Sequence, residues 1–236
     1  MPEVTVGPAS GYLAVPAESR GPWPGVVVIH ESWGLNGDIR AHADRLAAEG
    51  YLALAPDLYR GKSFVRCLRD VFRQLHAGSG SAFDTIDAAR AALAARPDAT
   101  GEDRGTRVLH GRRLRAAVRA AGGVLGGVGQ LRRGPGRRGA GAGRRLPHRG
   151  QLGARDPMGA RPPRRLADAL TALNIPHDVK VYPDAGHSFM STKPGTLALL
   201  ARLARLDYRP ESAEDSWRRI LVFFAEHLRS DPAPTS

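Results

Sequence analysis

The chain has 236 residues, a formal net charge of +12 at pH 7 and one cysteine, Cys67, so an internal disulfide is excluded. This length suffices for one core that buries most of the apolar surface, and a single domain over residues 1–236 is predicted. The N-terminus lacks a basic start followed by an apolar run, and no apolar stretch approaches about 18 residues, so a cytoplasmic location is expected.

The positive charge is concentrated in one segment. Residues 111–151 contain 11 arginines and no Lys, Asp or Glu, which leaves 24 basic and 23 acidic residues in the rest of the chain. A uniformly basic protein would indicate a nucleic-acid or anionic-surface partner. Because the remainder is nearly neutral, neither a specific nucleic acid nor a membrane is expected as a partner.

In chain order, the apolar pattern predicts strands that alternate with helices. Strands are expected at residues 11–15, 25–29, 52–56 and 178–182, and helices at residues 39–49, 82–95, 164–173 and 214–228. Asp38 is the expected N-cap of the first helix and Gly50 its stop, and Val179 and Val181 are expected to face inward. This order indicates an α/β fold with a mostly parallel sheet and helices on both faces.

The apolar strand at residues 25–29 is followed by His30 and the sequence ESWG. A strand this apolar is typical of one covered on both faces, and α/β folds place ligands at the carboxyl ends of such strands. Glu31 is therefore a candidate site residue. We interpret His30 as a packed strand-end residue rather than a ligand, and no His, Cys or Asp spacing indicates a metal site.

Two further motifs place an acid and a histidine on expected loops. GARDPM contains Asp156 and DAGHSF contains His187. In α/β-hydrolase folds the catalytic triad runs nucleophile, acid, histidine along the chain, and these residues occupy the second and third places. Together with VVVIHESWG, LAAEGYLALAPDLYRG and WRRILVFFAEHL, the motifs resemble the dienelactone hydrolase family, over residues 1–100 and 153–236.

The resemblance implies an α/β-hydrolase-like fold, hydrolysis of a lactone or ester by a Cys-His-Asp triad, and no cofactor. His187 would be the general base, and Asp156 would orient its imidazole. Glu31 would interact with the nucleophile's thiol before substrate arrives, and the backbone N–H of Ser32 would donate to the oxyanion. A small-molecule ester or lactone is the expected partner; its identity and the oligomeric state stay open.

The nucleophile elbow that the resemblance implies, Gly-x-Cys-x-Gly-Gly, is absent from the sequence. Cys67 lies in FVRCLR without flanking glycines and well before the expected position, so we interpret it as an ordinary partly buried or surface thiol. Residues 101–152 consist largely of Arg, Gly, Ala, Leu and Val, with no Phe, Tyr, Trp, Ile or Lys. Such a segment buries too little apolar surface to offset its chain entropy, and it is predicted to be disordered or misfolded as written.

A shifted reading frame accounts for this composition. Codons for residues 107–117 can be chosen so that reading one base later gives GFCTGGGFAL, with the expected cysteine falling near Leu109 and His110. The same offset gives AASVNYG from residues 126–132 and CPIVGS from residues 146–151. All three strings resemble family segments in the right order. We therefore hypothesise a pair of compensating frameshifts, near residues 101–107 and near residue 152, that arise from a sequencing error or a real lesion and leave the chain inactive as written. The alternative is a genuine basic insertion, which would need the core strands to be supplied elsewhere.

Two other functions remain open. A non-catalytic hydrolase-like protein would fold without turning over substrate. A nonspecific nucleic-acid binder would use the arginines of residues 111–151, but that segment has no aromatic side chains for stacking on bases. At the candidate positions, the ordinary alternatives are a solvated carboxylate for Glu31, a turn acid for Asp156 and a loop histidine for His187.

Overall fold

The computed structural model describes residues 3–17, 21–30, 33–61, 70, 73–74, 79–100, 148–155, 168, 171–172, 174, 177–192 and 207–228. The chain divides into two compact units. The first contains residues 1–64, 84–108 and 218–236, and the second contains residues 65–83 and 109–217. The expectation of a single domain stays a prediction.

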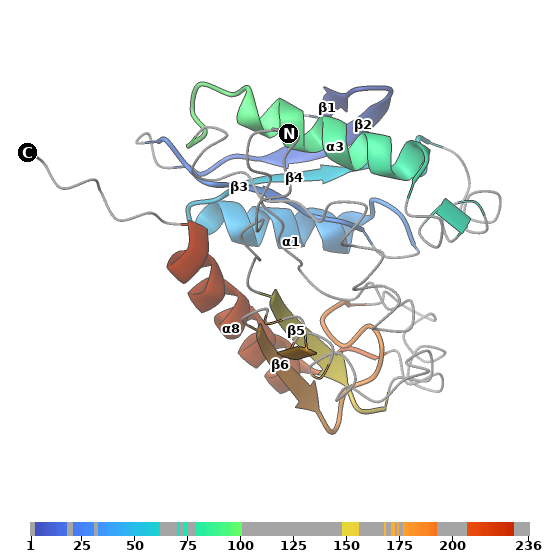
Figure 1. Ribbon diagram of the computed structural model, residues 1–236, viewed down its shortest axis with the longest axis vertical. Coiled ribbons are helices and arrows are strands. Elements are labelled where there is room, and N and C mark those ends of the chain that lie inside the picture. The colour runs from blue at the N-terminus through green and yellow to red at the C-terminus, as the bar shows by residue number, and fades with distance from the viewer. Residues whose placement is uncertain are drawn as a thin grey trace, which may run out of the picture. The chain divides into compact units, whose positions relative to one another are not determined.

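The first unit contains a four-stranded sheet with the strand order β1-β2-β4-β3 (Figure 1). Its strands are β1 (Glu3–Val6), β2 (Ala9–Ala14), β3 (Gly25–Val27) and β4 (Leu52–Pro56). β2 pairs antiparallel with β1 and with β4, whereas β3 pairs parallel with β4. This sheet is therefore mixed. β4 has the predicted bounds, β3 is shorter than expected, and β1 was not predicted.

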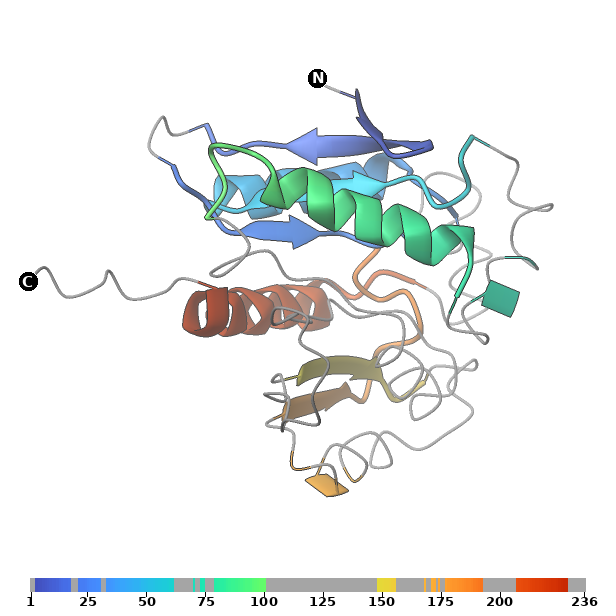
Figure 2. The same ribbon diagram turned by 45° about the horizontal axis from the view of Figure 1, so that its top comes forward.

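Two helices cover opposite faces of this sheet, α1 (Gly37–Ala48) and α3 (Ser81–Ala94) (Figure 1, Figure 2). Successive strand residues point to opposite faces, so each face has its own set of side chains. Leu13 and Leu54 are paired across β2 and β4, and they pack with Ile86 and Leu93 of α3 in one apolar core. Burial of these aliphatic side chains is what holds α3 on the sheet.

The other face meets α1 through a tyrosine. Tyr12 is paired with Ala55, and its hydroxyl donates a 2.6 Å hydrogen bond to the Asp44 carboxylate of α1. This bond, followed by burial, raises the pKa of Tyr12. The small Ala55 leaves the space beside Tyr12 in which α1 approaches the sheet.

The N-cap of α1 is Asn36, and the expectation of Asp38 was wrong. Asn36 has an extended backbone, and its Oδ1 accepts a 3.0 Å hydrogen bond from the N–H of Ile39. Asp38 lies inside the first turn, where a carboxylate favours the positive end of the helix dipole. Gly50, with φ of +82°, follows the helix end as predicted.

The segment after α3 is held to the chain before β3. Trp23 N–H donates to the Asp98 carbonyl at 2.9 Å, and Thr100 N–H donates to the Trp23 carbonyl at 3.0 Å. The Arg96 guanidinium makes two hydrogen bonds to the Asp98 carboxylate, of 2.7 and 2.6 Å. These bonds lower the pKa of Asp98, so the carboxylate is stabilised in its charged form.

The second unit contains a parallel pair, β5 (His148–Gly153) and β6 (His177–Tyr182). β5 corrects the expectation of disorder for the last residues of the segment 101–152, since residues 148–152 lie in a strand. Backbone pairing with β6 needs no apolar side chains, which explains why composition did not predict it. Residues 101–147 lie outside the described part of the chain.

Val181 was wrongly predicted to face inward, since it is 38% exposed. Tyr182 is the buried residue of β6, and it packs with Ala185, Phe189 and Met190. The buried face of the strand is therefore the one shared by Lys180 and Tyr182, whose polar ends have partners described below.

The C-terminal helix α8 (Pro210–Leu228) begins four residues before its predicted start at Glu214. One side of the helix forms an apolar stripe, in which Trp217, Ile220, Phe224 and Leu228 are buried. Phe224 meets Tyr51 edge to face, with ring centroids 5.6 Å apart. Of the predicted helix at residues 164–173, the structure describes residues 168, 171 and 172, which are helical. Within the described ranges, no helix combines the length and apolarity needed to cross a membrane.

Replacement of Asp98 by Asn is expected to lower the free energy of unfolding by about 1 kcal/mol at pH 7, because the paired carboxylate is lost. The pKa of Asp98 is lowered on folding, so its contribution is present above the unfolded value of about 3.9 and is lost as pH falls through the folded value. Urea denaturation at pH 7 and at about pH 2 should therefore show a difference only at pH 7. Arg96→Lys keeps the positive charge but not the two parallel hydrogen bonds, so it should lower the free energy of unfolding by less than Asp98→Asn does. An equal loss of stability for Asp98→Asn at both pH values would contradict this account.

Candidate active site

Of the predicted site residues, the structure describes His187. Glu31, Ser32 and Asp156 lie outside the described residues, as do the positions near Leu109 where the nucleophile was expected. The geometry of the candidate site therefore rests on His187 and on the segments that lead to the other positions. Among the described residues, no group of three His, Cys, Asp or Glu side chains could hold a metal ion.

His187 ends the turn that follows β6, residues 183–187, hereafter the histidine turn. Ala185 anchors the turn, because its side chain is fully buried and its N–H donates a 3.3 Å hydrogen bond to the Tyr182 carbonyl. Phe189, 2% exposed, packs against the ring of Tyr182 at a centroid distance of 5.2 Å. The half-buried His187 thus lies on a backbone segment that is anchored on both sides.

The loop that leads to Asp156 is bonded directly to the histidine turn. β5 and β6 are parallel and in register as far as Gly153, and two backbone hydrogen bonds continue beyond the strand ends. Ala154 N–H donates to the carbonyl at the end of β6 at 2.8 Å, and Arg155 N–H donates to the Ala185 carbonyl at 2.9 Å. Asp156 is the next residue along the chain. The two loops therefore leave the same edge of the parallel pair, as an acid and histidine pair requires.

Gly153 is required where these loops meet. A Cβ placed on Gly153 would lie 2.5 Å from the carbonyl oxygen of Ala185 and would also overlap that of Gly186. Both obstacles are backbone atoms, so no rotamer change relieves the overlap. The glycine therefore allows the close approach of β5 to the histidine turn.

The chain just before Glu31 is also fixed. His30 is 6% exposed, and its Nε2 accepts a 3.0 Å hydrogen bond from the N–H of Leu58. A ring nitrogen that accepts such a bond carries no proton, so the 3.9 Å approach of Nε2 to Asp57 is no charged pair. The Tyr59 ring packs edge to face on the imidazole at 4.9 Å. His30 is a packed strand-end residue, as interpreted from the sequence.

Asp57 organises the turn after β4, a role that sequence reasoning missed. Its carboxylate accepts hydrogen bonds from the N–H groups of Tyr59, at 2.9 Å, and Gly61, at 2.7 Å. Arg60 lies in the left-handed region with φ of 53° and donates to the hydroxyl of Thr85 at 3.3 Å. Asp followed by glycine four residues later is the available signal, because Asp side chains commonly bond to nearby backbone N–H groups in turns.

Substitution of Gly153 by Ala is expected to cost about 2–3 kcal/mol of unfolding free energy, since backbone must move to admit the methyl group. Gly37 provides the matched control, because a Cβ there meets nothing within 4 Å. Gly37→Ala, at the first residue of α1, should be neutral or slightly stabilising. Urea denaturation of both variants checks this. Equal stabilities for the two would show that a methyl group at Gly153 is tolerated and that the close approach does not require glycine.

The model of the dienelactone hydrolase family matches residues 9–105 and 145–228. A protein of Escherichia coli (strain K12) named "Putative carboxymethylenebutenolidase" is 30% identical over an alignment 243 positions long, which covers 92% of this chain and 82% of that protein. The unmatched residues 106–144 fall inside the segment whose composition departs from the rest of the chain.

Two solved structures share the fold. The structure titled "m3DLH" has a TM-score of 0.68 at 23% identity, and the dienelactone hydrolase-like promiscuous phosphotriesterase P91 from metagenomic libraries has 0.65 at 22%. Each comparison covers 94% of this chain and 93% of the other. They confirm the expected α/β-hydrolase-like fold. Since the family model matches on both sides of the central segment, the chain belongs to the dienelactone hydrolase family.

Proposed function

We propose that the undamaged form of this protein cleaves lactone or ester bonds with a Cys-His-Asp triad, and that the sequence as written is inactive because its nucleophile elbow is missing. The observation that carries the proposal is the 2.9 Å hydrogen bond from Arg155 N–H to the Ala185 carbonyl. It joins the residue before Asp156 to the turn that ends in His187. The bond joins two segments about thirty residues apart in the sequence. One leads to an acid and the other to a histidine, and the acid precedes the histidine along the chain, as in a hydrolase triad.

The roles follow from the chemistry of acyl transfer. The elbow cysteine, as thiolate, attacks the carbonyl carbon, and the oxyanion accepts a hydrogen bond from the Ser32 N–H. The alkoxide leaves with a proton from the imidazolium of His187, which Asp156 orients. His187 then takes a proton from water, which attacks the thioester and releases the acid. Glu31 interacts with the thiol before substrate arrives.

The interruption of the family match supports a frameshifted segment. The unmatched residues 106–144 lie within the proposed 101–152, and they include the position near His110 where the shifted frame encodes the cysteine. As written, the chain has only Cys67, which no flanking glycine places on an elbow turn. Without a thiolate at the elbow no acyl-enzyme forms, so His187 has no nucleophile to activate.

Resequencing the gene over codons 95–160 is expected to show single-base differences that restore GFCTGGG and the strings that follow it. The physical reason is that only the shifted frame encodes apolar strands where the fold needs its core. An unchanged reading of source DNA from independent isolates would show that the frame damage is real, or that residues 101–152 are a genuine basic insertion.

The chain as written should hydrolyse p-nitrophenyl acetate and simple lactones no faster than buffer, whereas the frame-restored chain should turn them over. In the restored chain His187→Gln should lower kcat by about 10³-fold or more, since the thiolate loses its base. His42→Gln on α1 is the control and should leave kcat unchanged.

Turnover by the chain as written that His187→Gln abolishes would overturn the inactivity. A restored chain that folds and stays inert would favour the non-catalytic alternative. Nucleic-acid binding by the chain as written should disappear when residues 111–151 are deleted, and should weaken steeply with salt before that.

A further inference from the structure

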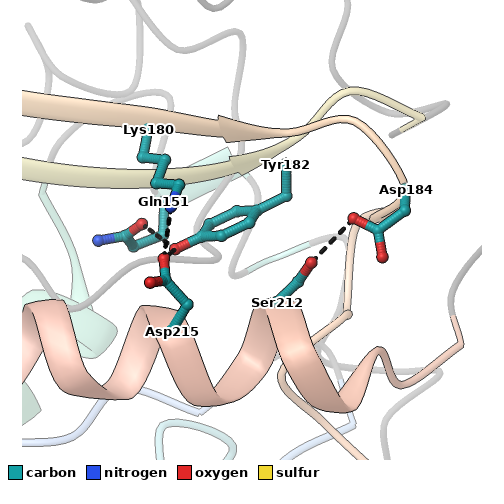
Figure 3. A network of polar contacts seen from close by, with 6 residues as sticks. All are labelled: Gln151, Lys180, Tyr182, Asp184, Ser212 and Asp215. Atoms are coloured by element: carbon teal, nitrogen blue, oxygen red, sulfur yellow. Dashed lines mark hydrogen bonds and ion pairs between the residues drawn. The ribbon is translucent and has the colours of Figure 1, made fainter.

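The start of α8 is bonded to β6 and to the histidine turn through two side chains, one helical turn apart (Figure 3). Ser212 Oγ donates a 2.8 Å hydrogen bond to Oδ1 of Asp184, within the histidine turn. Oδ2 of Asp215 accepts a 2.7 Å hydrogen bond from the hydroxyl of Tyr182, the last residue of β6. We call these two bonds the α8 clamp.

A backbone bond closes the same connection from the other side. Arg209 N–H, just before α8, donates to the Phe189 carbonyl at 3.0 Å. Two of the three bonds reach residues before His187, namely Tyr182 and Asp184, and the third reaches Phe189, two residues after it. The start of α8 thus holds the segment that carries His187 on both sides of the histidine.

The Asp215 carboxylate is a strong anchor because two donors share one oxygen. Lys180 Nζ lies 2.7 Å from the same Oδ2 that accepts from Tyr182, and it also lies over the Tyr182 ring, 5.0 Å from the centroid. Hydrogen bonds to an ionised acceptor are stronger than neutral ones. Lys180 and Tyr182 are two residues apart on one face of β6, so the strand presents both donors to α8 together.

Gln151 connects β5 to the same network of polar contacts. Oε1 of Gln151 lies 3.0 Å from the Tyr182 hydroxyl, and the buried Nε2 has no hydrogen-bond partner among the described residues. The hydroxyl has one proton, and its nearer acceptor is Asp215. The Tyr182 hydroxyl therefore lies between two acceptor oxygens, Oδ2 of Asp215 at 2.7 Å and Oε1 of Gln151 at 3.0 Å. The resulting chain runs from Gln151 through Tyr182 to Asp215.

We propose that Ser212 and Asp215 are positioning residues for His187, which act through Asp184 and Tyr182 to hold the histidine turn in place. The catalytic meaning of this role rests on the proposed function, in which His187 is the general base. The positioning itself can be measured without turnover, because the reactivity of the His187 imidazole reports how firmly the turn is held.

The test uses the full chain as written and diethyl pyrocarbonate, which modifies accessible neutral imidazoles, with mass spectrometry to follow each histidine. Ser212→Ala should raise the modification rate of half-buried His187 about fivefold, the factor that loss of one ordinary hydrogen bond gives. His42 on α1 is the internal reference and should react at an unchanged rate. Ser212→Thr keeps the hydroxyl and should restore the parent rate.

Two further variants separate the clamp from a general loosening of the fold. Tyr182→Phe removes the hydroxyl but keeps the ring in its apolar cluster, and it should also raise the His187 rate. Glu211→Gln removes a charge from an exposed side chain beside Ser212 and should change nothing. In the frame-restored chain, Ser212→Ala should lower kcat while leaving KM nearly unchanged, since the histidine and not the substrate pocket is displaced.

Several results would overturn the proposal. These are an unchanged His187 rate in both Ser212→Ala and Tyr182→Phe, an equal rise at His187 and His42, or a parent His187 that already reacts like a free imidazole. If the restored chain is inert but Ser212→Ala still releases His187 selectively, the proposed function fails and the positioning role is supported. The two claims are therefore tested separately.

Discussion

Two backbone N–H groups, those of Ala154 and Arg155, donate to carbonyl oxygens just beyond the paired ends of β5 and β6. The link between the loop that leads to Asp156 and the histidine turn depends on this extension of the ladder. A parallel pair brings two carboxyl ends to one edge, but loops usually diverge once pairing stops. Here Gly153 lets the two backbones approach so closely that they stay hydrogen-bonded as far as Arg155.

The second unit therefore combines two kinds of restraint on one histidine. The first is the backbone ladder, which depends on glycine at one position and otherwise tolerates many side chains. The second is the α8 clamp, which depends on the identity of a few polar side chains. If His187 is the general base, as proposed, these side-chain bonds supply the precise positioning that proton transfer requires.

Sequence patterns predicted apolar elements of two kinds: β4, whose five residues are all buried, and α8, which buries one apolar stripe. The bounds of β4 and the stripe of α8 follow from such patterns, and the motifs around Asp156 and His187 identified the family. The pattern misled at Val181, because the face of β6 that packs inward carries Lys180 and Tyr182, whose polar groups bond to Asp215.

The features that sequence reasoning missed are those decided by partners far along the chain. Ser212 and Asp215 are ordinary residue types for the start of a helix, so nothing local distinguishes them from solvated polar residues. Their significance comes from Asp184 and Tyr182, about thirty residues earlier. The N-cap of α1 shows the same limit at short range, since both Asn36 and Asp38 are good caps and only the backbone conformation decides between them.

On the frameshift proposal, Gln151 differs from the other members of its network because it lies inside the segment 101–152. Lys180, Tyr182, Ser212 and Asp215 all lie after residue 152, where either reading of the gene gives the same amino acids. The shifted frame that yields CPIVGS ends in glycine and serine at the place of Gln151, so the amide exists only in the chain as written. A repaired gene would keep both bonds of the clamp and change only the neighbour of the Tyr182 phenol. On the frameshift proposal, the altered segment and the side chains of the α8 clamp are encoded by separate parts of the gene, so the loss of the nucleophile would leave both bonds of the clamp encoded.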